Sequence, residues 1–113
     1  MTIKNLTPTL SVSPQILPPQ VADLARSGYR SIICNLPDGE CGFTQPRFAQ
    51  IEAAAKAAGM EAAYLPIIPG QAGPVEAAAF RNLLNSLPTP IIAFCRSGNR
   101  SASLYAMSQS VRA

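Results

Sequence analysis

The stretch Ile91-Ile92-Ala93-Phe94, followed at once by Cys95-Arg96-Ser97-Gly98-Asn99-Arg100-Ser101, decides the fold class. Its four consecutive apolar residues predict a strand of the kind that lies in the middle of a parallel sheet. We expect a final helix over about residues 101–111. A buried strand, a short polar loop and a helix in this order are typical of an α/β protein.

The rest of the chain alternates in the same way. We expect helices over 18–28, 46–59 and 75–87, each starting near a proline, and the first two end at a glycine. Strands are expected at 31–35 and 62–65, with an edge strand at 10–12. The pattern predicts one three-layer α/β domain over 1–113, whose largely parallel sheet of about four to five strands is flanked by helices.

Composition excludes several functional classes. Of the 113 residues 48% are hydrophobic, so the chain can bury a core, and no apolar run reaches the ~20 residues of a membrane span. The net charge is +3 without a basic run, which argues against nucleic-acid binding. We expect no signal peptide, no disulfide framework among the three cysteines, and a cytoplasmic location.

The chain contains no histidine. A Ser-His or Cys-His catalytic pair and a histidine-based metal site are therefore excluded, and we expect neither a metal nor another cofactor. Sites in parallel sheets usually lie beyond the carboxyl ends of the strands. This rule directs attention to Cys95, which follows the strand at 91–94.

Cys95 is the predicted nucleophile. The backbone amides of residues 96–100 can converge on its sulfur as an anion-binding nest, and the amino terminus of the next helix adds a positive field. Arg100 can fold back over the loop as a planar donor. Such surroundings favour the thiolate, which is the reactive form, without a histidine base.

The other loop residues are candidate anion-binding residues. Gly98 permits a positive φ, and Asn99 is expected to tolerate a left-handed conformation. Ser101 is expected to cap the helix or to donate its hydroxyl to the thiolate. Arg96 is expected to face outward and attract an anionic donor, and Ser97 completes the loop.

Three separated motifs carry a resemblance to a known family. Val12-Ser13-Pro14-Gln15-Ile16, Asn35-Leu36-Pro37-Asp38-Gly39-Glu40 and Cys95 to Ser101 resemble the phosphatase-like domain of β-lactamase-hydrolase-like proteins. The resemblance implies a fold similar to dual-specificity phosphatases and a sulfurtransferase activity. Some family members are fused to a metallo-β-lactamase-like persulfide dioxygenase, which makes such an enzyme a candidate partner.

The leading hypothesis is a rhodanese-type sulfurtransferase that carries sulfane sulfur as a persulfide on Cys95. Four residues separate Cys95 from Arg100, as in rhodanese-type loops, whereas the phosphatase pattern has five. The loop 69–74 holds no acid, and Phe94 stands where phosphatases have a histidine. Thiosulfate or a persulfide is the expected donor, because a sulfur leaving group departs without protonation.

Two alternatives stay open. A cysteine phosphatase would use Cys95 and Arg100 on a phosphorylated substrate, with a phosphocysteine intermediate and Asp38 or Glu40 as its acid, although Pro-Asp-Gly is also a standard turn. A non-catalytic anion-binding module is the third reading. Cys34 is expected in the core, and Cys41 has no assigned role, although it lies on a loop from which it could resolve a persulfide or disulfide on Cys95.

Overall fold

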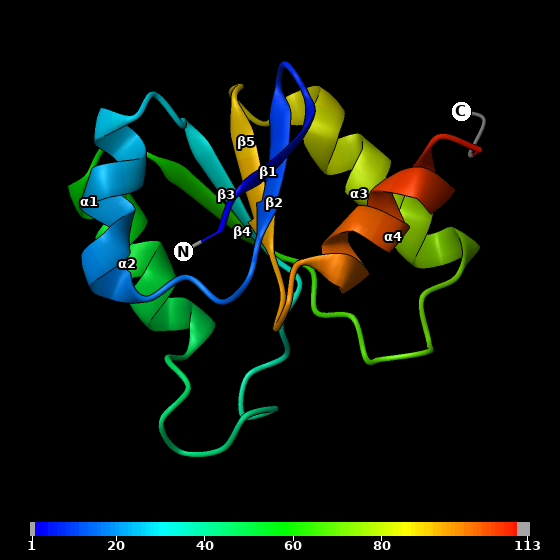
Figure 1. Cartoon of the computed structure of the whole chain (residues 1–113), viewed down its shortest axis with the longest axis horizontal. Helices are drawn as coiled ribbons and strands as arrows, with labels where there is room; N and C mark the ends of the chain where they lie inside the picture. Colours follow the sequence, from blue (N-terminus) through cyan, green and yellow to red (C-terminus); the bar gives the residue numbers. More distant parts are fainter. Residues whose placement is uncertain (1, 111–113) are drawn as a thin grey trace.

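The computed structural model describes residues 2–110 and contains one mixed sheet. Four of its strands run parallel, and the fifth lies at one edge and pairs antiparallel with its single neighbour. The spatial order is β1 (Lys4–Thr7), β2 (Leu10–Ser13), β5 (Ile91–Phe94), β3 (Ser31–Cys34) and β4 (Glu61–Tyr64) (Figure 1). The expectation of a largely parallel sheet is confirmed, and β5 lies at its centre.

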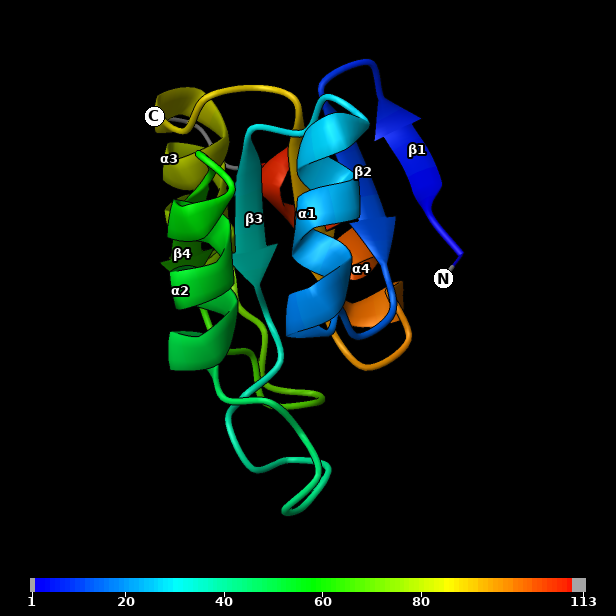
Figure 2. The same cartoon turned by 90° about the vertical axis from the view of Figure 1, so that its left-hand side faces the viewer.

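Helices cover both faces of the sheet and give three layers (Figures 1 and 2). One face carries α1 (Pro18–Arg26) and α2 (Phe48–Ala57), and the other carries α3 (Pro74–Ser86) and α4 (Asn99–Ser108). Consecutive strand residues point to opposite faces. Ile32 and Ile92 therefore pack with the first helix pair, whereas Ile33 and Ala93 pack with the second. Both faces of β5 are buried, which explains its continuous apolar sequence.

Several expectations about the elements are wrong, among them the start of the final helix, which is Asn99 rather than residue 101. Leu10–Val12 is not an edge strand, because β1 pairs with β2 and covers it, and Asn5 Oδ1 accepts a 2.8 Å hydrogen bond from Ser11 Oγ. The second helix begins at Phe48 rather than at residue 46, since the Gln50 side chain accepts from the Arg47 N–H and ends the preceding loop there. Residue 111, expected in the final helix, lies outside the described residues.

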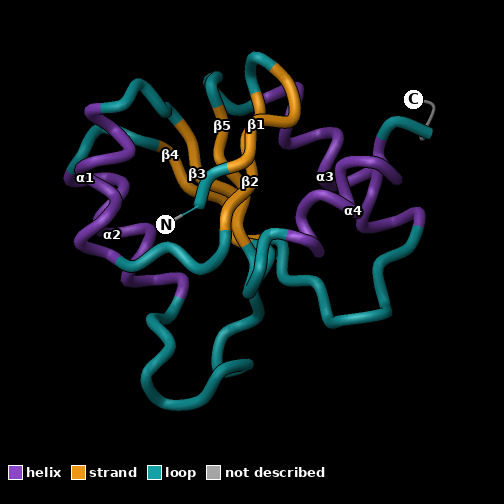
Figure 3. The backbone as a smooth tube through the Cα atoms, viewed as in Figure 1, coloured by secondary structure: helices purple, strands orange, loops and turns teal. Residues whose placement is uncertain are grey.

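The parallel strands all end at one edge of the sheet, and the connections that follow them gather there. Figure 3 shows these connections, residues 35–47, 65–73 and 95–98, side by side below the sheet. The first follows β3, the second follows β4, and the third follows β5. Among residues 2–110, no helix is long and apolar enough to cross a membrane.

Candidate active site

Cys95 lies at the carboxyl end of β5, and its sulfur accepts a 3.0 Å hydrogen bond from the Gly98 N–H. Gly98 has a φ of 93°, as expected for a glycine at this turn, and it is the N-cap of α4. A Cβ at Gly98 would lie 3.3 Å from the Ser13 carbonyl carbon, so the loop packs tightly against the end of β2. The expected left-handed Asn99 is wrong, because Asn99 is the first residue of α4.

Arg100 is held by two other connections. Its Nη1 and Nη2 donate to Glu40 Oε1 and Oε2, each at 2.9 Å, and Nη1 also donates to the Ile67 carbonyl at 2.9 Å. The hydrogen bonds to Glu40 are the main cause of a raised pKa of Arg100, and the nearby sulfur of Cys95 also contributes. These bonds use three of the five guanidinium N–H groups. The other two, at Nε and Nη2, form a fork suited to two oxygens of an anion.

Arg100 also lines a pocket of about 450 Å³. It opens between the 65–73 connection and the first turn of α4, and its lining includes Pro69, Gly70, Ser97, Asn99 and Arg100. Cys95 is only 1% exposed and is not among the lining residues. The pocket therefore gives access to Arg100, whereas the sulfur of Cys95 is shielded from solvent in this structure.

Ser101 neither caps the helix nor contacts the sulfur, which corrects the expectation for it. Its hydroxyl donates to Asn35 Oδ1 at 2.8 Å, and both residues are fully buried. Asn35 did not figure among the candidate site residues. One signal in the sequence could have revealed it: a buried amide directly after the apolar strand Ser31–Cys34 needs polar partners.

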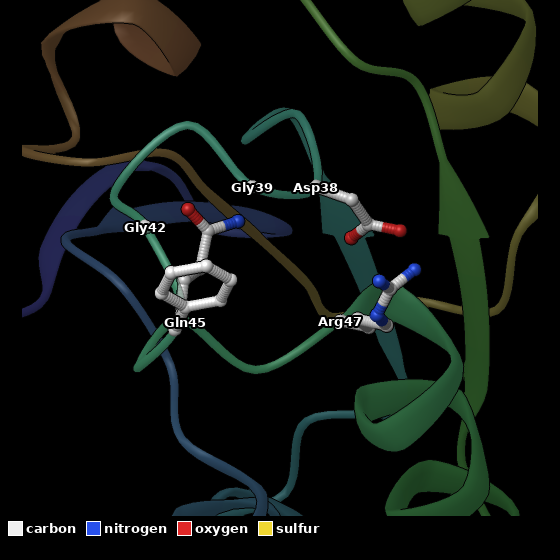
Figure 4. A pocket seen from close by; sticks show the side chains of 6 residues that line it. Asp38, Gly39, Gly42, Gln45 and Arg47 are labelled. Atoms are coloured by element: carbon white, nitrogen blue, oxygen red, sulfur yellow. The ribbon is translucent and has the colours of Figure 1, made fainter.

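Asp38 lies in the 35–47 connection, two residues before Glu40. Its Oδ1 accepts a 2.7 Å hydrogen bond from the Phe48 N–H at the start of α2, and its own N–H donates to the Tyr64 hydroxyl at 2.8 Å. It lines a second pocket, of about 510 Å³, in which Figure 4 shows the Asp38 and Arg47 side chains on the same side. Of the two carboxylates of this turn, Glu40 is therefore the one that contacts Arg100.

The remaining predicted residues have simple environments. Arg96 and Ser97 are exposed, as expected for Arg96, and Cys41 is half-buried beside Glu40. Cys34 is 3% exposed, so its expected place in the core is confirmed, and burial raises the pKa of its thiol to about 12. Within residues 2–110 no three metal-ligating side chains lie close enough together to hold a metal ion.

Comparison with known sequences identifies the family. Residues 2–112 match the phosphatase-like domain of beta-lactamase hydrolase-like proteins. The chain belongs to this family. The beta-lactamase hydrolase-like protein of Xylella fastidiosa is 33% identical over 109 residues, which cover 96% of this chain and 25% of that protein. The Agrobacterium fabrum protein of the same name is 32% identical over 96 residues. This phosphatase-like domain thus spans about a quarter of the length of these curated relatives.

Solved structures agree with this assignment. A candidate phosphatase from Neisseria meningitidis is 33% identical, with a TM-score of 0.86 over 93% of this chain and 74% of that one. P. aeruginosa TpbA, crystallised with phosphotyrosine as its C132S variant, is 19% identical, with a TM-score of 0.70 over 95% of this chain and 61% of that one. The second likeness shows the fold alone, which is that of cysteine phosphatases. The comparisons therefore favour the phosphatase alternative over the sulfurtransferase hypothesis.

Proposed function

We propose that this phosphatase-like domain is a cysteine-dependent phosphatase that hydrolyses phosphate monoesters through a phosphocysteine intermediate. The arrangement of Arg100 carries the proposal. Glu40 and Ile67 hold three of its N–H groups and leave the fork at Nε and Nη2, and Arg100 also lines the 450 Å³ pocket. Such a fork matches two oxygens of a phosphoryl group. The Gly98 N–H, directed at Cys95 Sγ, stabilises negative charge on the nucleophile.

The reaction takes two steps. Cys95 Sγ attacks phosphorus, so that an S–P bond forms while the P–O bond to the leaving group breaks, and the bonding electron pair departs with that oxygen. Arg100 and the loop amides neutralise the charge on the equatorial oxygens. A water molecule then attacks the phosphocysteine and releases a proton to the solvent, the S–P bond breaks, and phosphate leaves with the thiolate restored.

An aryl phosphate is the favoured substrate class. Both oxygens of Glu40 accept hydrogen bonds from Arg100, so this side chain is already engaged and is not placed to protonate a leaving group. A phenolate leaves with less help from an acid than an alkoxide does. TpbA, which shares the fold, is crystallised with phosphotyrosine, and this agrees with the same choice of substrate.

The deciding experiment is turnover of p-nitrophenyl phosphate by wild type, Cys95→Ser and Cys41→Ser. We expect wild type and Cys41→Ser to release p-nitrophenol, and Cys95→Ser to lose turnover to the background, because a serine hydroxyl is not ionised at neutral pH. Intact-mass analysis of acid-quenched wild type should show a phosphoryl adduct that Cys95→Ser lacks. Turnover retained by Cys95→Ser, or no turnover by the folded wild type, rejects the proposal.

Sulfur transfer remains the second candidate, and one observation favours it. Four residues separate Cys95 from Arg100, and a loop of this length suits one terminal sulfur better than a phosphoryl group. Incubation with thiosulfate or glutathione persulfide, followed by intact mass, separates the two candidates. An adduct of about 32 Da on Cys95, formed by a protein that does not hydrolyse p-nitrophenyl phosphate, would replace phosphatase by sulfurtransferase and would make a persulfide dioxygenase a sensible partner.

A further inference from the structure

Asn35 makes four hydrogen bonds to three different segments although it is fully buried. Its N–H donates to the Phe94 carbonyl at 2.8 Å, and its carbonyl accepts from the Ile67 N–H at 3.0 Å. In the side chain, Nδ2 donates to the Leu65 carbonyl at 2.9 Å and Oδ1 accepts from Ser101 Oγ at 2.8 Å. The amide thus has one fixed orientation.

These partners surround the nucleophile loop. Phe94 directly precedes Cys95, and Ser101 directly follows Arg100, so one residue ties down both ends of the loop. A third connection, through Ile67, leads to the guanidinium of Arg100. The Ile67 N–H is bonded to Asn35, and the Ile67 carbonyl accepts from Arg100 Nη1 at 2.9 Å. Asn35 therefore connects to the flanks of Cys95 and Arg100 without contacting either reacting group.

We infer that Asn35 is a positioning residue that fixes the separation between Cys95 and Arg100. The inference rests on the proposed function, because it assigns Asn35 a part in the same phosphoryl transfer. Two of its bonds come from the backbone and would survive substitution. The two side-chain bonds link the 65–73 connection to the first turn of α4. Without them, the Leu65 carbonyl and the Ser101 hydroxyl lose their partner in the interior.

The expected consequence is a displaced first turn of α4. Gly98 is the N-cap of this helix, so a shift moves its N–H relative to Cys95 Sγ as well as moving Arg100. Displacements of about 1 Å away from the reacting atoms can lower rates on the order of a hundredfold. The effect falls mainly on kcat, since the interactions lost are those that strengthen in the transition state.

Asn35→Ala is compared with Ser31→Ala as a matched control. Ser31 is the first residue of β3, the strand that Asn35 directly follows, and it is also fully buried. Ser31→Ala loses one side-chain hydrogen bond, the 2.7 Å bond from Oγ to the Pro88 carbonyl. Both variants should lower the melting temperature. We expect Asn35→Ala to lower kcat for p-nitrophenyl phosphate at least about tenfold, and Ser31→Ala to leave it within about twofold.

Ser101→Ala supplies a second variant and closes a double-mutant cycle. If the loss of kcat in Asn35→Ala arises from the broken hydrogen bond between Asn35 and Ser101, the variant that carries both substitutions should have a kcat no lower than that of the slower single variant. The rate of Cys95 alkylation by iodoacetamide, taken as the ratio between pH 6 and pH 9, gives a readout that needs no turnover. This ratio should fall in Asn35→Ala and stay unchanged in Ser31→Ala, because the displaced Gly98 N–H stabilises the thiolate less.

The two proposals fail in different ways. Wild type without phosphatase activity, but with an alkylation ratio that falls only in Asn35→Ala, rejects the phosphatase and keeps the positioning role. Active wild type, with Asn35→Ala matching Ser31→Ala in kcat and in alkylation ratio, rejects the positioning role and keeps the phosphatase. Fully additive effects of Asn35→Ala and Ser101→Ala on kcat also reject the positioning role of Asn35.

Discussion

Arg100 and Glu40, sixty residues apart in the chain, form a two-point ion pair in which both Nη atoms donate to the carboxylate at 2.9 Å. Both side chains are largely shielded from solvent, with 16% and 18% exposed. The pair has two opposing effects on an anionic ligand. It orients the guanidinium, and it also places a negative charge against the same guanidinium that the ligand must bind.

Replacing Glu40 separates these two effects. We expect Glu40→Gln to bind vanadate several-fold more tightly, because a repelling charge is removed, and to lower kcat several-fold, because Arg100 is held less firmly. The free energy of unfolding should fall by about 1–2 kcal/mol. Inhibition and rate measurements check this result. Glu61→Gln, an exposed site on β4 with the same change of charge, is the control, and equal behaviour of the two variants contradicts the prediction.

Gly98 offers a test of the contact between the loop and β2. Gly98→Ala combines an unfavourable φ of 93° with a Cβ only 3.3 Å from the Ser13 carbonyl carbon, so the amide that points at Cys95 must move. Gly59→Ala has a comparable φ of 76° and open space around the new Cβ. We expect both variants to lose about 1–2 kcal/mol of stability. Only Gly98→Ala should also lose most of its turnover. Similar activity in the two variants would show that the tight approach has no catalytic consequence.

Asp38 can be tested as the proton donor without disturbing α2, because Asp38→Asn keeps the Oδ1 that accepts from the Phe48 N–H. If Asp38 supplies the proton, turnover of phenyl phosphate should fall by about a hundredfold. Turnover of p-nitrophenyl phosphate, whose leaving group is stable as an anion, should change much less. Equal changes for the two substrates, measured side by side, would remove Asp38 from the reaction.

Cys34 makes stability depend on pH in the alkaline range. Burial raises the pKa of this thiol from 9.0 to about 12. The folded state therefore holds the proton more tightly than the unfolded state does, so the contribution is fully present below pH 9 and is lost as the pH rises toward 12. Denaturant unfolding of wild type should show a slope of up to about 1.4 kcal/mol per pH unit there that Cys34→Ala lacks. Parallel curves for the two proteins would contradict this assignment.

Local patterns predicted the centre of the fold. β5 and the Cys95 loop could be predicted because an apolar run, a polar loop and a helix follow one another within a short stretch. β1 was missed because Lys4–Thr7 is exposed or half-buried and has no apolar periodicity. Its strand conformation comes from pairing with β2, which is a tertiary effect.

The long-range contacts of the site could not be predicted in the same way. The pairs Arg100–Glu40 and Ser101–Asn35 join residues 60 and 66 positions apart, and no local rule specifies such partners. Asn99 was misassigned for a local reason, since Gly98 already provides the positive φ and the helix can begin one residue later. The sequence therefore located the Cys95–Ser101 loop but not the long-range hydrogen bonds that hold it.

The residues of the site come from two kinds of segment, the end of β5 with the start of α4, and two longer connections. Cys95 and Gly98 are set by β5 and α4, whereas Glu40 and Ile67 come from segments that contribute no strand to the sheet. Such connections tolerate insertions and substitutions that the sheet does not. Residues 36–47 and 68–73 can therefore change to suit another ligand, whereas Asn35, Leu65 and Ile67 must keep the hydrogen bonds that hold the Cys95 loop.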